Sequence, residues 1–118
     1  MKRLMIIIVT LSAFLIPAAP AWAHAMLEHA SPGAGAELAA APRAVTLAYS
    51  QQLEPAFCAV AVTDSAGRDV TAGAVDAHDS TMAVPLKALR PGTYRVSWHA
   101  VSIDTHRTEG AFTFTVKP

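Results

Sequence analysis

Apolar side chains recur at every second position in three segments of this chain, and this period constrains the fold most. The segments are residues 45–50, 93–102 and 110–116. Because alternate side chains of a strand project to opposite faces, each segment predicts a β-strand with one buried face. The only helix-friendly run, residues 39–41, is cut short by Pro42. Short alternating strands with turn residues between them indicate a single antiparallel β-sandwich or barrel.

The intervening segments predict shorter elements. We expect a first strand over residues 25–30, a buried strand over 57–63, and short edge strands with loops over 68–80. Residues 82–86 contain Pro85, which cannot donate to a ladder and therefore suits an edge strand. The single cysteine, Cys58, cannot form an internal disulfide, and we interpret it as a small apolar filler rather than a metal ligand.

Residues 1–23 have the layout of a secretory signal peptide. Basic residues at positions 2 and 3 precede an apolar run, 4–16, that is shorter than the roughly 20 residues of a spanning helix. We expect cleavage after Ala23, which would leave one domain, residues 24–118, in the periplasm. Cleavage after Ala25 stays open, because Ala23-His24-Ala25 also has the Ala-x-Ala form, and so does an uncleaved anchor.

Charge excludes some classes of partner. Nine basic and nine acidic residues balance in the whole chain. Loss of Lys2 and Arg3 with the signal peptide leaves seven basic residues against nine acidic ones. The sequence therefore offers no basic surface for nucleic acid or for an anionic membrane.

Cleavage after Ala23 would make His24 the first residue, with its α-amine and imidazole free to chelate one metal ion. These groups titrate near 7.7–8.0 and 6.5, so both can be neutral donors close to neutral pH. Nitrogen donors in a planar arrangement suit Cu(II), whereas a structural zinc site is disfavoured by the single cysteine.

Asp104 and His106 are the predicted partners of His24. In an extended segment, residues two apart project to the same side, so both could face one ion while Thr105 points away. An Asp-x-His triplet alone is a weak signal, but together with an N-terminal histidine it predicts a site for one Cu(II) per chain. Whether Gln51, His29 or Met26 contributes stays open. We interpret His29 as exposed, His99 as a cross-strand polar residue and Met26 as packed.

From His24 to Val116 the chain resembles the CopC family of periplasmic copper carriers. The matching residues are His24-Ala25, Ser31-Pro32, 47–50, 54–57, 91–96, Trp98, and the block Val101-Ser102-x-Asp104-x-His106 with Glu109-Gly110-x-Phe112-x-Phe114-x-Val116. The resemblance implies a Greek-key β-barrel of cupredoxin-like or immunoglobulin-like form. It also implies Cu(II) ligation by His24 through amine and ring, with Asp104 and His106.

The chain departs from some relatives in two places. Those relatives have a methionine-rich loop that binds Cu(I). The corresponding residues here, 64–86, contain one methionine, Met82, and one histidine, His78. We therefore expect no thioether Cu(I) site. Gln51 stands where some relatives have a glutamate near the copper, which leaves an extra carboxylate in doubt.

The sequence thus predicts a non-enzymatic, monomeric periplasmic protein that buffers Cu(II) or delivers it to a membrane copper importer or another periplasmic copper protein. A histidine-brace copper oxidase acting on polysaccharide is one alternative, although Asp104 would fill a coordination position that oxidase chemistry needs open. A metal-free immunoglobulin-like interaction module is the other. That module would explain the strands but not the pairing of the cleavage site with Asp-x-His.

Overall fold

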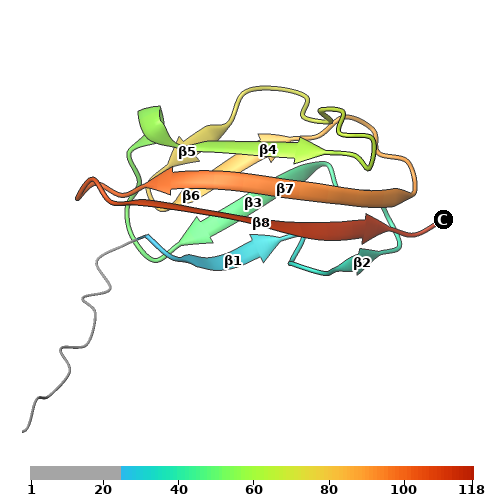
Figure 1. Ribbon diagram of the computed structural model, residues 1–118, viewed down its shortest axis with the longest axis horizontal. Coiled ribbons are helices and arrows are strands. Elements are labelled where there is room, and N and C mark those ends of the chain that lie inside the picture. Colours follow the sequence, from blue (N-terminus) through green and yellow to red (C-terminus); the bar gives the residue numbers. More distant parts are fainter. Residues whose placement is uncertain (1–24) are drawn as a thin grey trace, which may run out of the picture.

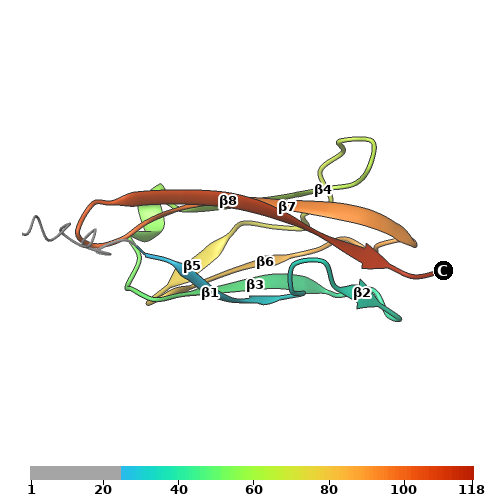
Figure 2. The ribbon, with the colours of Figure 1, turned by 60° about the horizontal axis from the view of Figure 1, so that its bottom comes forward.

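The computed structural model describes residues 25–118, which form two four-stranded sheets packed face to face (Figures 1 and 2). One sheet has the order β1-β3-β6-β5, with bounds Leu27–Ser31, Ala44–Tyr49, Thr81–Pro85 and Asp76–His78. The other has the order β2-β8-β7-β4, with bounds Glu37–Leu38, Arg107–Val116, Gly92–Val101 and Ala59–Thr63. This arrangement confirms the predicted all-β sandwich. The predicted signal peptide and His24 lie outside the described residues.

The core lies between the inner faces of the two sheets. Val45, Leu47 and Tyr49 of β3 are buried, and Val96 of β7 and Phe114 of β8 are buried opposite them. Full burial of one such side chain contributes about 1.5–3 kcal/mol. The period of two in these strands therefore predicted the buried faces correctly.

The predicted buried strand at 57–63 is wrong at its start. Pro55–Phe57 form a 3-10 turn, η1, and β4 begins only at Ala59. Proline is compatible with the first turn of a helix, because its fixed φ suits that position and its missing N–H is not needed there. Phe57 is consequently 63% exposed. Cys58 is half-buried, and its Sγ donates to the carbonyl of Glu54 at 3.2 Å, in keeping with its interpretation as a filler.

The prediction of an edge position for residues 82–86 is also wrong, because β6 lies between β3 and β5. Pro85 is tolerated at the last residue of β6, beyond the point where Asp76 of β5 pairs with Ala83. Of the short edge strands and loops predicted over 68–80, the structure has one strand, β5, and it lies at the edge of its sheet. The antiparallel expectation fails at β2, which pairs in parallel with the end of β8. Within residues 25–118, no helix is long and apolar enough to cross a membrane.

The connections between strands gather at two ends of the sandwich (Figure 1). The 102–106 end holds the β7–β8 connection, residues 50–58 and the β5–β6 connection. Leu53 ties these together, since its N–H donates to the carbonyl of Asp79 at 2.8 Å and it bridges to Ser102. The 64–68 end, at the other extreme, holds the turn after β4 and residues 86–91 before β7.

Candidate metal centre

Residues 102–106 join β7 to β8 as a tight turn at one end of the sandwich. The N–H of Thr105 donates to the carbonyl of Ser102 at 2.8 Å, and the N–H of Ser102 donates to the carbonyl of His106 at 3.0 Å. Thr105 has a φ of 69°, in the left-handed region. The extended backbone expected here is therefore wrong.

Asp104 and His106 nevertheless meet across the turn. Nδ1 of His106 lies 3.2 Å from Oδ2 of Asp104, and the two side chains are 49% and 39% exposed, respectively. The sequence predicted that an extended backbone would bring these two side chains together. The chain instead reverses direction in a turn, and the side chains still meet. An imidazole and a carboxylate thus lie side by side within reach of solvent.

The buried Ser102 fixes the position of the Asp104 carboxylate. Ser102 is completely buried, and its hydroxyl donates to Oδ1 of Asp104. This hydrogen bond, followed by the one from His106, lowers the pKa of Asp104 below its ordinary value. Asp104 is therefore ionised near neutral pH, and its carboxylate is held in place by these hydrogen bonds. Sequence reasoning missed this positioning role of Ser102, for which its place two residues before Asp104 was the available signal.

His24, the third predicted ligand, lies outside the described residues, but the residue that follows it is well placed. Ala25 is buried, and its carbonyl accepts a 2.8 Å hydrogen bond from the hydroxyl of Thr108. The N–H of Met26 donates to the hydroxyl of Ser50 at 2.8 Å. These bonds fix the start of the described chain beside the first residues of β8, two positions beyond His106.

The described residues supply a pair of candidate ligands rather than a complete site. Within residues 25–118, no three histidine, cysteine, aspartate or glutamate side chains cluster closely enough to hold a metal ion. Asp104 and His106 can offer one carboxylate oxygen and one imidazole nitrogen, so a stable site needs further donors. The predicted amine and imidazole of His24 would be such donors.

The remaining candidates lie on several elements of the fold. His29 is exposed on β1, as expected, and His99 is half-buried on β7 opposite Glu109. Gln51 is half-buried at the 102–106 end. Met26, interpreted as packed, is only partly so, because it is 45% exposed.

A second histidine–aspartate pair lies at the same end of the molecule. Nε2 of His78 is 3.2 Å from Oδ2 of Asp79, in the connection between β5 and β6. Both side chains are far more exposed than those of Asp104 and His106. This pair has the same chemistry without the buried serine, and it is therefore a natural control for the candidate site.

Comparison with known proteins gives a consistent result. Residues 27–117 match the family model described as the CopC domain. The chain is 41% identical over 100 residues to Protein YobA of Escherichia coli K12, covering 81% of each chain. It is 36% identical over 115 residues to copper resistance protein C of Pseudomonas syringae pv. tomato, covering 90% of each. The crystal structure of CopC from Methylosinus trichosporium OB3b matches with a TM-score of 0.74 and 32% identity, over 80% of this chain and 95% of that one.

Proposed function

The chain belongs to the CopC family, and from that premise we propose that it is an exported, non-enzymatic protein that binds one Cu(II) ion and buffers or delivers it. The copper resistance protein C relatives support copper as the cargo. Location in the periplasm follows from the proposed signal peptide, cleaved after Ala23.

The proposed ligands are the α-amine and imidazole of His24, the carboxylate of Asp104 and the imidazole of His106. One observation carries this assignment. The hydrogen bond from Thr108 to the carbonyl of Ala25 holds the residue after His24 beside the strand that begins just after His106. A chain start anchored elsewhere on the sandwich could not complete this site.

Each described residue has a defined task in this account. Ser102 fixes Asp104, whose negative charge offsets part of the charge of the metal ion. His106 contacts Asp104 before metal binding, and it supplies a neutral nitrogen to the ion afterwards. Three nitrogens and one oxygen suit Cu(II). Reduction to Cu(I), which prefers softer ligands, would favour release to a membrane copper importer or another periplasmic copper protein.

Signal-peptide cleavage has a chemical consequence in this account. Before cleavage, the nitrogen of His24 is part of a peptide bond and is not a free amine. The precursor would therefore lack the chelate, and processing would create the site after export. A carboxylate in the remaining coordination position also favours a carrier over an oxidase, because Asp104 would occupy a position that substrate or oxygen would need.

Titration with Cu(II) of protein that begins at His24 tests the proposal. We expect His106→Ala to weaken binding by more than the roughly 10–100-fold that follows loss of an outer-shell partner. His78→Ala is the matched control, because it removes a histidine with the same aspartate contact at the same end of the molecule. Equal affinities of wild type and His106→Ala, or an equal loss in both variants, would contradict the assignment.

A further inference from the structure

The large apolar side chains exposed by residues 25–118 all lie at the 102–106 end. They are Phe57, 63% exposed, Ile103, 53% exposed, and Met26, 45% exposed. They come from η1, from the β7–β8 connection and from the residue before β1. Single exposed apolar residues are common on protein surfaces. Their restriction to the end that carries Asp104 and His106 is what requires an explanation.

The backbone that presents these side chains is firmly held. The N–H of Ile103 donates to the carbonyl of Gln52 at 3.1 Å, and that of Glu54, at the start of η1, donates to the carbonyl of Val101 at 2.8 Å. At the other end of η1, the thiol of Cys58 donates to the backbone carbonyl of Glu54 at 3.2 Å. Phe57 and Ile103 are therefore displayed by ordered backbone, which lowers the entropic cost of burying them against a partner.

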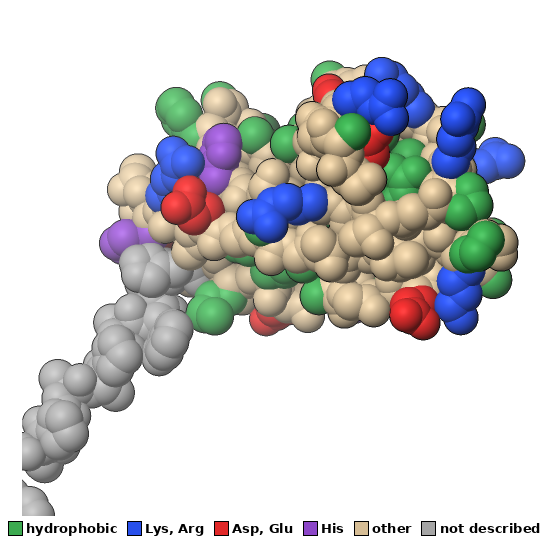
Figure 3. Space-filling model, turned by 45° about the vertical axis from the view of Figure 1, so that its right-hand side comes forward, with side chains coloured by type: hydrophobic (Ala, Val, Ile, Leu, Met, Phe, Trp, Pro, Cys, Tyr) green, Lys and Arg blue, Asp and Glu red, His purple; other side chains and the backbone are tan. Residues whose placement is uncertain are grey.

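The balance of basic and acidic side chains differs between the two ends of the molecule. Basic side chains gather toward the 64–68 end, the end where the C-terminus lies (Figure 3). They are Arg43, Arg68, Lys87, Arg90 and Lys117. Acidic side chains predominate toward the 102–106 end, namely Glu28, Glu54, Asp79, Asp104 and Glu109. Asp64, Asp69 and Glu37 lie toward the 64–68 end, where the basic residues outnumber them. Arg107 is the basic residue there, and it pairs with Glu109 at 3.5 Å. The apolar residues around the candidate metal centre are thus surrounded mainly by acidic side chains.

We propose that the 102–106 end is a docking surface for a copper-accepting protein domain whose own copper site is surrounded by an apolar patch and by lysine or arginine residues. The proposal rests on the proposed function, because it assigns the delivery step to a surface. Asp104 and His106 are partly exposed among the three apolar residues. Burying Phe57, Ile103 and Met26 would bring the ligands of two proteins together, and copper could pass without release into solvent.

The charge distribution selects this occupant over two others. An anionic bilayer would repel the acidic end and would attract the opposite one. A second copy, docked end to end, would place two acidic ends against each other, which costs free energy through like-charge repulsion. A basic partner gains both apolar burial and electrostatic attraction.

Site-specific photocrosslinking in the cells that make the protein tests the proposal. p-Benzoylphenylalanine is placed at Phe57, and at the exposed Ala88 near the opposite end as control. We expect position 57, but not position 88, to crosslink to one protein, which is identified by mass spectrometry and purified. That protein should accept copper from the Cu(II)-loaded chain, and its association rate should fall by about tenfold or more as ionic strength rises.

Variants then separate docking from copper binding. Phe57→Asp should slow transfer to the purified acceptor by about tenfold or more, since apolar anchors dominate such interfaces, while its Cu(II) titration matches wild type. Ala88→Asp is the charge-matched control and should transfer normally. Ile103→Ser provides a second test if Phe57→Asp folds poorly.

Three outcomes would overturn the proposal. They are equal crosslinking at both positions, crosslinks only to lipid or to a second copy, and unchanged transfer in Phe57→Asp and Ile103→Ser. Failure of wild type to bind Cu(II) would instead contradict the proposed function.

Discussion

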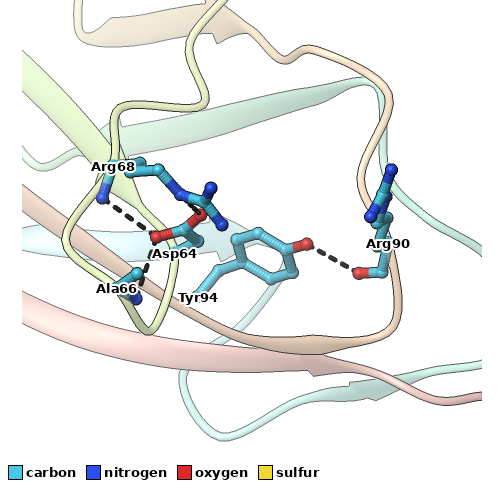
Figure 4. A network of polar contacts seen from close by, with 5 residues as sticks. All are labelled: Asp64, Ala66, Arg68, Arg90 and Tyr94. Atoms are coloured by element: carbon cyan, nitrogen blue, oxygen red, sulfur yellow. Dashed lines mark hydrogen bonds and ion pairs between the residues drawn. The ribbon is translucent and has the colours of Figure 1, made fainter.

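Two aspartates in turns at opposite ends of the sandwich show how the same side chain can serve structure or binding. Asp64 closes the turn after β4 (Figure 4). Its Oδ1 accepts 2.9 Å hydrogen bonds from the N–H groups of Ala66 and Arg68, and its Oδ2 contacts Nε of Arg68 at 2.9 Å. The hydrogen bond from the Arg68 backbone is the main cause of the lowered pKa of Asp64. All of these partners belong to the turn itself.

Asp104 has a lowered pKa for a different reason. Its main partners are side chains, the hydroxyl of Ser102 and the imidazole of His106, and the backbone of His106 contributes less. A backbone N–H within a turn cannot move away without unfolding the turn, but an imidazole can turn from a carboxylate to a metal ion. The comparison teaches that donor type, more than pKa, separates a structural carboxylate from one available for binding.

The comparison extends to the two buried tyrosines. The hydroxyl of Tyr94 donates to the carbonyl of Arg90 at 2.6 Å, which braces the 64–68 end (Figure 4). The hydroxyl of Tyr49, toward the 102–106 end, is buried without a hydrogen-bond partner among the described residues, and burial raises the pKa of Tyr49 well above its usual range. The ring of Tyr49 packs edge-on against Trp98, with centroids 5.2 Å apart. The hydroxyl of Tyr94 thus has an internal acceptor, whereas the hydroxyl of Tyr49 has none among the described residues.

The largest expected effect is stabilisation by Cu(II). A ligand that binds only the native state at 100 times its Kd adds about 2.7 kcal/mol to the free energy of unfolding. Asp104→Asn should lose most of this gain in thermal melts of protein beginning at His24, because it removes a proposed ligand. Asp64→Asn should melt at a lower temperature without metal and yet keep the full Cu(II) gain. An equal Cu(II) gain in wild type and Asp104→Asn would remove the distinction between the two carboxylates.

A smaller effect is expected from removing each tyrosine hydroxyl. Tyr94→Phe should lower the free energy of unfolding by about 1 kcal/mol, the usual net contribution of one hydrogen bond. Tyr49→Phe should leave it unchanged or raise it by about 1 kcal/mol, because a buried hydroxyl without a partner is costly. Urea unfolding of the two variants measures the difference. A larger loss in Tyr49→Phe than in Tyr94→Phe would contradict this difference in hydrogen bonding between the two hydroxyls.

The smallest effect concerns acid stability. Because the pKa of Asp64 is lower in the folded chain than its ordinary value near 3.8, its contribution is present above that value and is lost as pH falls through the folded pKa. Wild type should therefore lose stability more steeply below about pH 4 than Asp64→Asn does. Urea midpoints measured between pH 2 and 6 report the two slopes. Superimposable slopes would show that the Asp64 turn carries no charge-dependent stability.

The inner strands could be predicted from sequence because their burial follows a period of two. Val45, Leu47 and Phe114 are where the pattern placed them. Phe57 was misjudged, because an apolar residue beside an apolar strand looks like core, and only Pro55 signalled that the chain was still turning. The inner position of β6 depends on how distant strands pair, and a proline at a strand terminus carries no information on that point.

The pairing of Asp104 with His106 was predicted for the wrong backbone. Their spacing of two suggested an extended segment, whereas a left-handed φ at Thr105 reverses the chain and still brings them together. Local spacing thus indicated the contact but not its geometry. The anchoring of Ala25 to Thr108 involves residues 83 positions apart, so it could be read only from the fold. Ligation by His24 stays a prediction.

The most direct test of the central claim adds one residue. Protein beginning at His24 and protein with a single glycine before His24 have the same described fold residues and the same imidazoles, but only the first has a histidine α-amine. Competition titration with Cu(II) should give a Kd for the extended protein that is higher by more than about 100-fold, beyond the cost of losing an outer-shell partner. The same Kd for both proteins would contradict the claim that cleavage before His24 creates the copper site.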